Sequence, residues 1–297
     1  MKWGCDMLLQ QIVNGLSIGS IYALMAVGYS LIYSLMNFTN FAHGVVVTLG
    51  AYFGFYSLTL LSPNIAVAFI VALMFGGVVS SIIELTTYRP LLLKNSKRSY
   101  LTIAGLGIQI IVENLLIIML GGRFKTYPLA LFNTGSINFF GSNIGVIDLY
   151  ILLISIFLLI LVELYVNCTK NGLAIRSAAY STDIASIMGV DVDKLMIKVF
   201  FLAGTLAGIA GYFLGIKYTA YPQLSVLSNK AFISAVLGGL GSLTGSVVGA
   251  IILGLLETFV SGYISSSLRD IFSFGLLVLV LLFRPTGIMG KSSEDKA

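Results

Sequence analysis

The residues that could perform chemistry in this sequence are few and scattered. His43 is the only histidine among the 297 residues, which excludes a metal site built from several imidazoles. Cys5 and Cys168 lie far apart without a CxxC neighbour, so they indicate neither a zinc site nor a disulfide framework. Hydrolytic chemistry would need a histidine paired with a serine, paired aspartates or a metal-ligand cluster. We therefore predict that the chain is not an enzyme.

His43 lies in a short polar interruption between two long apolar stretches, the run Asn40-Phe41-Ala42-His43-Gly44. A histidine here favours a hydrogen-bonding role where a helix begins, with a gate or pathway role as the alternative. Asn40 and Gly44 beside it are typical of a capped, tightly packed entry to a broken helix. These three residues are therefore candidates for a pathway or broken-helix site.

The elements that must position these residues lie in lipid. Apolar residues make up 58% of the chain and charged residues only 10%, whereas ordinary soluble domains carry about 25% charged residues. The formal net charge of +5 comes from Lys and Arg in short clusters between apolar runs. Such clusters set membrane topology and are not typical of nucleic-acid binding. We predict an all-α polytopic transmembrane helical bundle, with residues 1–297 forming a single domain.

Eight runs have the length of about 20 apolar residues that a spanning helix needs. They are too uniformly apolar for barrel strands, which alternate polar and apolar residues over about ten positions. Their boundaries are expected to be correct to within about four residues. The predicted segments are 7–36, 42–62, 64–83, 100–120, 147–166, 198–217, 231–262 and 268–284.

The connecting segments predict how the chain is oriented. Segments 84–99 and 167–198 are clearly basic, so both should be cytoplasmic. Two predicted helices separate them, and the two assignments therefore agree. Segment 121–146 is then the largest external loop, and the N-terminus lies outside.

The C-terminal tail tests this topology, because Lys291 and Lys296 favour a cytoplasmic position for it. A single crossing at 231–262 would place the tail outside, whereas a segment that dips in and returns on the same side removes the conflict. Non-helical backbone at membrane depth is tolerated only where protein or a water-filled cavity covers it, so such a break should border a pathway. The residues that supply the break are Gly238, Gly239, Gly241, Ser242 and Gly245.

Glu113 is the deepest acid within the apolar runs, and Gln109 lies one turn away on the same helical face. Intramembrane acids are costly and are functional candidates by default. Two interpretations stay open for Glu113, namely hydrogen bonding between helices and contact with a solute. Glu84, Glu163 and Glu257 lie nearer the ends of their runs, where pairing at the interface or between helices is expected.

Segment 167–198 is too polar to cross a membrane and predicts a short helix followed by the start of a second. Gly172 is expected to precede the first helix, and Gly189 offers a C-cap. Asp191 or Asp193 can cap the next helix. The segment is therefore either a simple connector or a docking element with its own helix.

The docking interpretation depends on side-chain size and polarity. Small residues would permit close approach of a partner's groove, and Arg176 and Asp183 would serve as polar anchors. The small residues concerned are Ala174, Ala178 and Ala185.

This segment resembles the cytoplasmic coupling loop of permease subunits of ABC importers for branched-chain amino acids. Tyr180 and Ser181 stand where that family usually has acidic residues. The positions that match its pattern in register are Gly172, Arg176, Ala179, Asp183, Ala185 and Gly189. Further family words occur in order along the chain: NFAHG from Asn40 to Gly44, RPL from Arg89 to Leu91, VLGGLGS from Val236 to Ser242 and RPTG from Arg284 to Gly287.

The resemblance implies a multi-pass permease of a prokaryotic inner membrane. It implies a related permease subunit, two cytoplasmic ATPase subunits and an external solute-binding protein as partners. It also implies that this chain binds no cofactor, and that the ATPase partners bind ATP and Mg²⁺. In agreement, Gly290-Lys291-Ser292 lacks the glycine and the preceding strand of a phosphate-binding loop.

Two alternatives remain for the function. Related permeases carry urea, short amides or aromatic acids, so the cargo could belong to those classes. A stand-alone ion-coupled transporter or channel is the other alternative, but such proteins usually show paired acids or a charged relay at midplane. Glu113 is the single strong candidate for that role in this sequence.

Overall fold

The computed structural model describes residues 2–290 except 95, 133–134 and 140–141, and its described part is predominantly α-helical. A short π-helical segment, Ser57–Leu61, extends α2, and another, Glu84–Tyr88, extends α3. Turns of 3₁₀ helix occur at Leu129–Leu131, Pro222–Leu227 and Ser266–Leu268. The helices are α1 (Lys2–Met36), α2 (Ala42–Tyr56), α3 (Ile65–Ile83), α4 (Arg89–Leu93), α5 (Arg98–Leu120), α6 (Val146–Cys168), α7 (Lys170–Tyr180), α8 (Thr182–Ile187), α9 (Val192–Tyr218), α10 (Ser228–Gly238), α11 (Leu243–Tyr263) and α12 (Arg269–Phe283).

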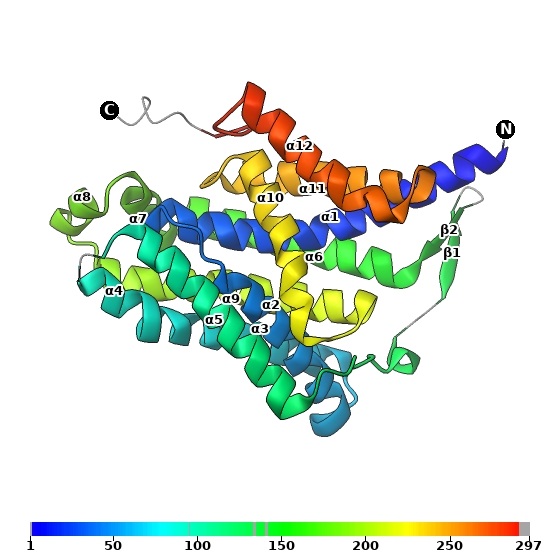
Figure 1. Cartoon of the computed structure of the whole chain (residues 1–297), viewed down its shortest axis with the longest axis horizontal. Coiled ribbons are helices and arrows are strands. Elements are labelled where there is room, and N and C mark those ends of the chain that lie inside the picture. Colours follow the sequence, from blue (N-terminus) through cyan, green and yellow to red (C-terminus); the bar gives the residue numbers. More distant parts are fainter. Residues whose placement is uncertain (1, 95, 133–134, 140–141, 291–297) are drawn as a thin grey trace.

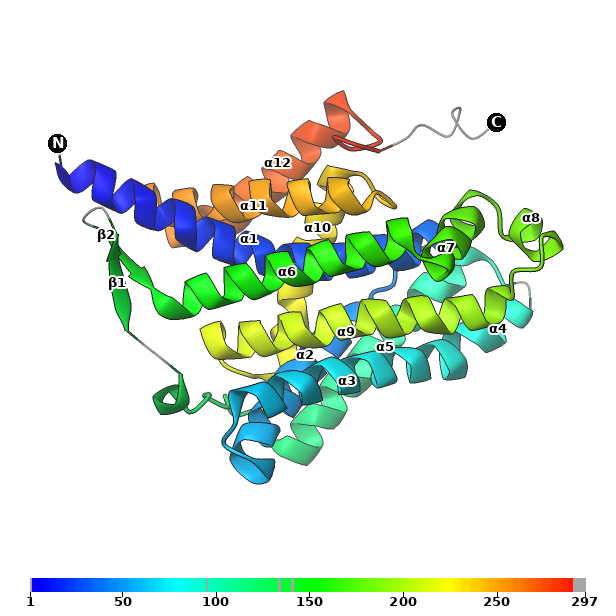
Figure 2. The same ribbon diagram turned by 180° about the vertical axis from the view of Figure 1, so that it is seen from behind.

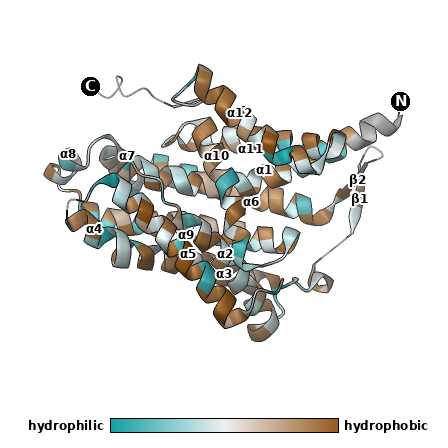
Figure 3. Cartoon of the chain, viewed as in Figure 1, coloured by the Kyte–Doolittle hydropathy of each residue, from teal (hydrophilic) through white to brown (hydrophobic). Residues whose placement is uncertain are grey.

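The predicted membrane segments are confirmed, since eight helices of the described chain are long and apolar enough to span a bilayer. Figure 3 shows apolar residues along the whole length of these helices. Two boundaries differ noticeably from prediction: the third span continues to Leu93, and the sixth begins at Val192. The predicted run 231–262 is divided, because α10 ends at Gly238 and α11 alone is long enough to span.

The long helices run between two ends of the molecule (Figure 1). One end carries α4, α7 and α8, and the other carries the start of α1 and the hairpin of β1 (Ser136–Phe139) and β2 (Ser142–Gly145). We call these the α7–α8 end and the hairpin end. Segments 84–99 and 167–198 therefore share one end and 121–146 lies at the other, as the charge pattern predicts. Asn133 and Gly141 of that loop, and Lys291 and Lys296, lie outside the described residues.

The β-hairpin is a feature that the sequence analysis did not predict. Its strands pair antiparallel, with Ile137 opposite Ile144. Each strand has only four residues, which is too short for an alternating pattern to stand out from the surrounding polar loop.

The helices form two faces. Helices α5, α10 and α12 lie on the face seen in Figure 1, and α3, α6 and α9 lie on the face seen in Figure 2. Helices α1 and α9 form the interior, since 89% of the most apolar window of each is buried. Helices α5 and α12 are covered least, with 11% and 6% of their windows buried.

Close backbone approach holds α9 against α2 and α3. A side chain at Gly208 would overlap the carbonyl oxygen of Ala72, and one at Gly76 would come within 2.8 Å of the Gly208 Cα atom. Gly211 faces the carbonyl oxygen of Val47 in the same way. Small faces of this kind drive helix association in lipid, where apolar side chains gain little from leaving the solvent. These glycines therefore have a packing role.

The substitution Gly208→Val is expected to destabilise the folded chain by at least about 3 kcal/mol, because two backbones in contact cannot separate without losing their whole interface. The measurement is the midpoint of thermal unfolding of the detergent-purified protein. Gly275→Val on α12 is the matched control, since nothing lies within 4 Å of a Cβ placed there. Equal loss of stability in the two variants would contradict the packing role.

Candidate functional site

The broken helix predicted within 231–262 consists of α10, a glycine turn and α11. The turn uses Gly239 with φ +108° and Gly241 with φ +87°, a conformation that side chains with a Cβ rarely adopt. The Ser242 side chain then caps α11 by accepting a hydrogen bond from the Gly245 backbone at 3.1 Å. A side chain at Gly238 would overlap the Gly245 carbonyl, so the two helices meet backbone to backbone. These residues are brought together as predicted.

Helix α10 lies across the long helices and points from the hairpin side of the molecule toward the α7–α8 end (Figure 1). Helix α11 then returns alongside α1 toward the hairpin end (Figures 1 and 2). The segment therefore enters and returns, and α12 ends on the side opposite to the start of α1. This geometry removes the topological conflict that a single crossing would create.

The entry to α2 lies against α10 and the 3₁₀ turn before it. A Cβ at Gly44 would lie 3.2 Å from the carbonyl oxygen of Ser225 and from the Ser228 side chain, which confirms the tight packing expected there. The capping role expected of Asn40 is wrong, because no side chain caps α2. Instead, the buried Asn40 amide oxygen accepts a 2.6 Å hydrogen bond from the Tyr88 hydroxyl. Asn40 therefore ties the start of α2 to the end of α3.

His43 occupies the predicted position at the start of α2 and is fully buried. Its ring lies 4.6 Å from the ring of Tyr29, measured between centroids, and packs against Gly28 of α1. Neither ring nitrogen forms a well-aligned hydrogen bond with a described residue. The backbone carbonyl of Met25 is nevertheless close enough to interact with the ring. The structure thus places His43 at the contact of α1 and α2, and its gate role stays a prediction.

Glu113 and Gln109 share a helical face on α5, as predicted, and both reach the turn before α10. The Gln109 amide donates to Glu113 at 2.9 Å and lies 3.4 Å from the Ser225 hydroxyl. Ser225 also donates to the Glu113 carboxylate. This polar cluster joins α5, otherwise little covered, to the broken helix.

A charged network fixes the start of α10 and confirms the pairing between helices that was expected of Glu257, although its partners were not predicted. The ammonium group of Lys230 lies 2.8 Å from a carboxylate oxygen of Glu257 on α11 and 2.8 Å from one of Asp270 on α12. Glu257 also accepts hydrogen bonds from Tyr22 at 3.0 Å and from Ser273 at 2.8 Å. Glu257 is only 1% exposed, so each of its oxygens is satisfied inside the bundle.

The single short helix predicted before Gly189 is wrong, because extended backbone at Ser181 divides it into α7 and α8. Gly172 lies in the first turn of α7 and does not precede it as expected, since Thr169 is the N-cap and accepts from the Gly172 backbone at 3.0 Å. A Cβ at Gly172 would overlap the carbonyl oxygens of Tyr165 and Val166. Gly172 is therefore required for the tight turn from α6 into α7.

Arg176 contacts the chain itself. Its guanidinium donates to the backbone carbonyl oxygens of Val166 at 2.7 Å and of Asn167 at 2.9 Å, which are left free at the end of α6. Ala185 is buried, and Ala179 is partly buried, so these small side chains face the protein. Arg176, Ala179 and Ala185 thus position α7 and α8 for any partner contact.

Helix α8 presents an apolar surface. Ser181 caps its start and Asp183 lies in its first turn. Its C-cap is Met188, and Gly189 follows directly with φ +88°, so Gly189 ends the helix from the position after the cap. Ile187 and Met188 are 84% and 80% exposed. Such exposure of neighbouring large apolar residues marks an interaction site.

Asp191 begins α9, because its carboxylate accepts from the Lys194 backbone at 3.1 Å. A hydrogen bond from the Lys194 side chain holds the pKa of Asp191 below its usual value. The expected cap of the second helix is therefore Asp191, and it fixes the exit from the segment. The candidate residues form two groups: the pathway group around α10, and the coupling group at the α7–α8 end.

Comparison with known proteins decides the family of this chain. Residues 11–281 match the family model described as the branched-chain amino acid transport system / permease component. The chain belongs to this family. It is 34% identical over 302 residues to the high-affinity branched-chain amino acid transport system permease protein LivH of Salmonella typhimurium, with 97% of both chains covered. It is similarly 33% identical to the permease protein BraD of Pseudomonas aeruginosa, again with 97% of both covered.

The fold of this permease family member is also found in a solved structure. That structure is described as an inward-facing conformation of a metal-chelate type ABC transporter. The superposition covers 91% of this chain and 85% of the transporter chain, with a TM-score of 0.50. The identity of 18% means that the likeness concerns the fold alone. The predicted all-α, polytopic, ABC permease-like fold is confirmed.

The structure gives the RPTG word of the permease a specific position. The segment after α12 returns to the end of α10, where the Ile288 backbone donates to Leu237 at 2.9 Å and the Met289 backbone donates to Gly238 at 2.9 Å. Gly287, with φ +83°, lies against Gly239. The C-terminal segment therefore completes the glycine turn, and two words far apart in sequence form one site.

One signal could have revealed the missed network of the permease. Lys217 and Lys230 border apolar runs on the predicted external side, where the positive-inside rule disfavours cations. Both are paired: Lys230 with Glu257, and Lys217 with Asp148, which also accepts from Ser17 at 3.0 Å. A polar cavity of about 380 Å³ lies between the two groups.

Proposed function

We propose that this chain is the membrane permease subunit of an ATP-driven importer for branched-chain or related hydrophobic amino acids in a prokaryotic cell membrane. The observation that carries the proposal is the apolar surface of α8, where Ile187 and Met188 are 84% and 80% exposed at the end of a bundle built for lipid. A cytoplasmic surface of this kind has no use in a channel that acts alone. Family membership favours the same function.

The proposed partners are two ATPase subunits, a related permease subunit and an extracytoplasmic solute-binding protein. The ATPases bind ATP and Mg²⁺ and dock on α7 and α8, where Asp183 offers an exposed polar contact beside the apolar one. The second permease covers α5 and α12, which carry the largest unburied share of the described spans. The binding protein delivers solute to the hairpin end.

The proposed pathway follows the face that carries α2, α5 and α10. Broken helices border it at Gly44 and at the glycine turn after Gly238. The Gln109–Glu113–Ser225 cluster contributes polar groups along it. Such a surface binds its cargo weakly, which suits a pathway whose selectivity lies in the binding protein.

Other cargo remains compatible with this site. Urea, short amides and aromatic acids would also pass a weakly polar pathway, and a stand-alone ion-coupled transporter is the alternative of another class. The paired acids typical of ion coupling are not found along α5 within the described residues, where Glu113 is the acid that contacts the broken helix.

The test is reconstitution of the chain in proteoliposomes with its ATPase, permease and binding-protein partners. ATP hydrolysis is expected to be stimulated by the loaded binding protein, with leucine, isoleucine and valine ahead of urea and amides. Counterflow by the chain alone is the control. Uphill uptake by the chain without an ATPase would overturn the proposal, and stimulation by amides alone would change the cargo but not the mechanism.

A further inference from the structure

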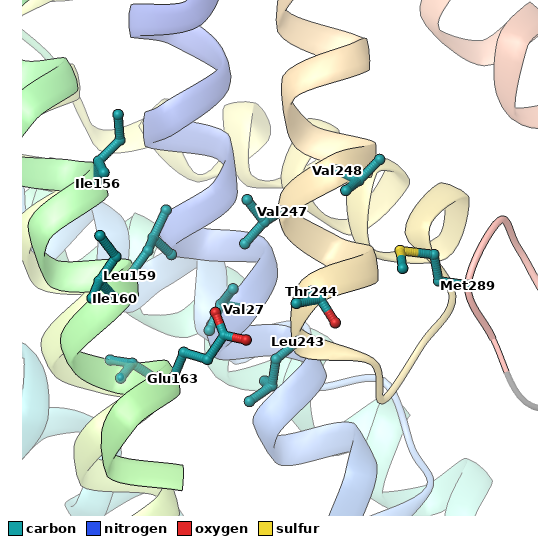
Figure 4. Close-up of a pocket in the computed structure, with 11 residues that line it drawn as sticks. Val27, Ile156, Leu159, Ile160, Glu163, Leu243, Thr244, Val247, Val248 and Met289 are labelled. Carbon is teal, nitrogen blue, oxygen red and sulfur yellow. The ribbon is translucent and has the colours of Figure 1, made fainter. Parts of the chain in front are cut away.

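A groove on the outer surface of the bundle contains an acid with no partner. It lies between α1, α6 and α11 and has a volume of about 310 Å³. Figure 4 shows the Glu163 carboxylate reaching from α6 toward Thr244 of α11, with Val27 of α1 between them. Glu163 makes no hydrogen bond or ion pair with any described residue. Glu163 is exposed near the α7–α8 end of α6, at the level where a lipid headgroup could reach it, and the pairing between helices that was one expectation for it is not seen among the described residues.

The groove opens on the face that lipid covers. Helix α6 lies on the side opposite to α5 and α12, the helices that the second permease is proposed to cover (Figures 1 and 2). Its outward residues are large and apolar, with Phe157 60% and Ile160 52% exposed. A protein partner is therefore placed on the other face, and the solvent of this one is the bilayer.

The groove has an apolar part and a polar mouth. Ile156 and Val248 line it toward the middle of the spans, whereas Glu163 and Thr244 lie at the α7–α8 end of their helices. An acyl chain fits the apolar part. The headgroup must then lie at the mouth.

The mouth is complementary to a headgroup that carries both charges. Glu163 accepts hydrogen bonds from an ammonium group. Thr244 lies in the first turn of the 21-residue helix α11, whose dipole favours a negative group there, and its hydroxyl makes no hydrogen bond with a described residue. Figure 4 shows the Glu163 carboxylate turned toward α11, whereas the Thr244 hydroxyl is turned away from Glu163, toward Met289.

We propose that this groove binds one phospholipid with a primary ammonium headgroup. The ammonium group contacts Glu163, the phosphate lies near Thr244 and the start of α11, and one acyl chain fills the groove. The bound lipid neutralises the acid and fills the space between α1, α6 and α11. This inference rests on the proposed position of the second permease on α5 and α12, but it does not depend on the cargo or on the ATPase partners, because lipid binding is measured without transport.

The test is native mass spectrometry of the detergent-purified full chain with phosphatidylethanolamine, phosphatidylcholine and phosphatidylglycerol of identical acyl chains. The wild-type protein should retain one phosphatidylethanolamine in preference to the others. Glu163→Gln should weaken that retention by about tenfold, because a charge-assisted hydrogen bond is lost. Thr244→Val should weaken it less. Asp193→Asn, which removes an exposed acid near the same end, should leave it unchanged.

Equal retention of phosphatidylethanolamine by wild type and Glu163→Gln would overturn the proposal. Equal retention of phosphatidylcholine and phosphatidylethanolamine by the wild type would also overturn it, because the choline headgroup has no N–H group to donate to Glu163. The remaining possibility, a protein in the groove, is tested by Ile160→Cys in an assembled transporter whose Cys5 and Cys168 are serine. Cross-linking of this cysteine to the second permease would also overturn the proposal, whereas labelling only by a lipid-soluble maleimide would support it.

Discussion

Transport is expected to fall by about a hundredfold when Ile187 and Met188 are both replaced with aspartate, since interface anchors of this kind typically contribute about 2–4 kcal/mol. Both side chains project from the end of α8, where Ile187 is 84% exposed and Met188 is 80% exposed. Charges there would remain solvated in the free chain but would be buried unpaired against an ATPase. The measurement is solute-stimulated ATP hydrolysis and uptake in proteoliposomes.

A matched pair of leucines distinguishes docking from a general effect of substitution. Ile187→Leu with Met188→Leu keeps the surface apolar and should retain most of the activity. Both double variants should unfold at the wild-type temperature, because neither side chain is packed within the chain. Normal stimulation of the aspartate variant would show that α8 is not the docking surface.

Gly189 tests the same surface through backbone geometry. Its φ of +88° strains any residue with a Cβ, although nothing lies within 4 Å of that position. A bulky residue at Gly189 should therefore turn the end of α8 and uncouple hydrolysis from transport while leaving membrane insertion intact. Persistence of the stimulation would contradict the docking assignment.

The spans could be predicted because each is a long, uniformly apolar run, and lipid leaves the chain few alternatives to a helix. Helix α10 could not be predicted in the same way. It has 11 residues and joins α11 in one apolar stretch, so hydropathy does not separate them. The break was predictable from Gly239 and Gly241, whose type carries conformational information that hydropathy lacks.

In the coupling segment, the ends of the helices could be predicted from the sequence, but the contacts of the side chains could not. The end of the short helix at Gly189 and the start of α9 at Asp191 follow from local rules of helix ends. The direction in which each side chain points depends on packing against α6, which the sequence does not specify. Arg176 therefore contacts α6 carbonyls, and Ile187 and Met188 form the exposed surface that the alanines were expected to supply.

The charged network on α10 could be predicted least. Lys230, Glu257 and Asp270 lie on three helices, and only the return of the chain at the glycine turn brings them together. The position of Glu257 near the end of its apolar run predicts that it pairs, but a single sequence does not identify Lys230 and Asp270 as members of the network. The network therefore exists only in the folded structure, and its energetic role has to be measured there.

Removal of the central acid of this network is expected to destabilise the protein strongly. Glu257→Ala leaves the Lys230 ammonium without its buried partner, deprives Tyr22 of its acceptor and removes one of the two acceptors of Ser273. The loss of one partner of a buried pair typically costs about 3–5 kcal/mol. The measurement is the free energy of unfolding in a titration with denaturing detergent. Asp270→Ala is the control, since Asp270 is 67% exposed and its pair contributes at most about 1 kcal/mol.

A double variant separates attraction between the charges from the cost of an unpaired charge. Lys230→Met with Glu257→Leu removes both charges and keeps apolar volume, and apolar replacement of a buried pair is often neutral. Stability should therefore recover to within about 1–2 kcal/mol of the wild type, with the remainder due to the unsatisfied hydroxyl group of Tyr22, since Ser273 also donates to the Arg269 carbonyl. Strictly additive losses from the two substitutions would show that Lys230 and Glu257 do not stabilise one another. The position of α10 would then depend on its glycine contacts with α11, and its charges would be available to the solute pathway.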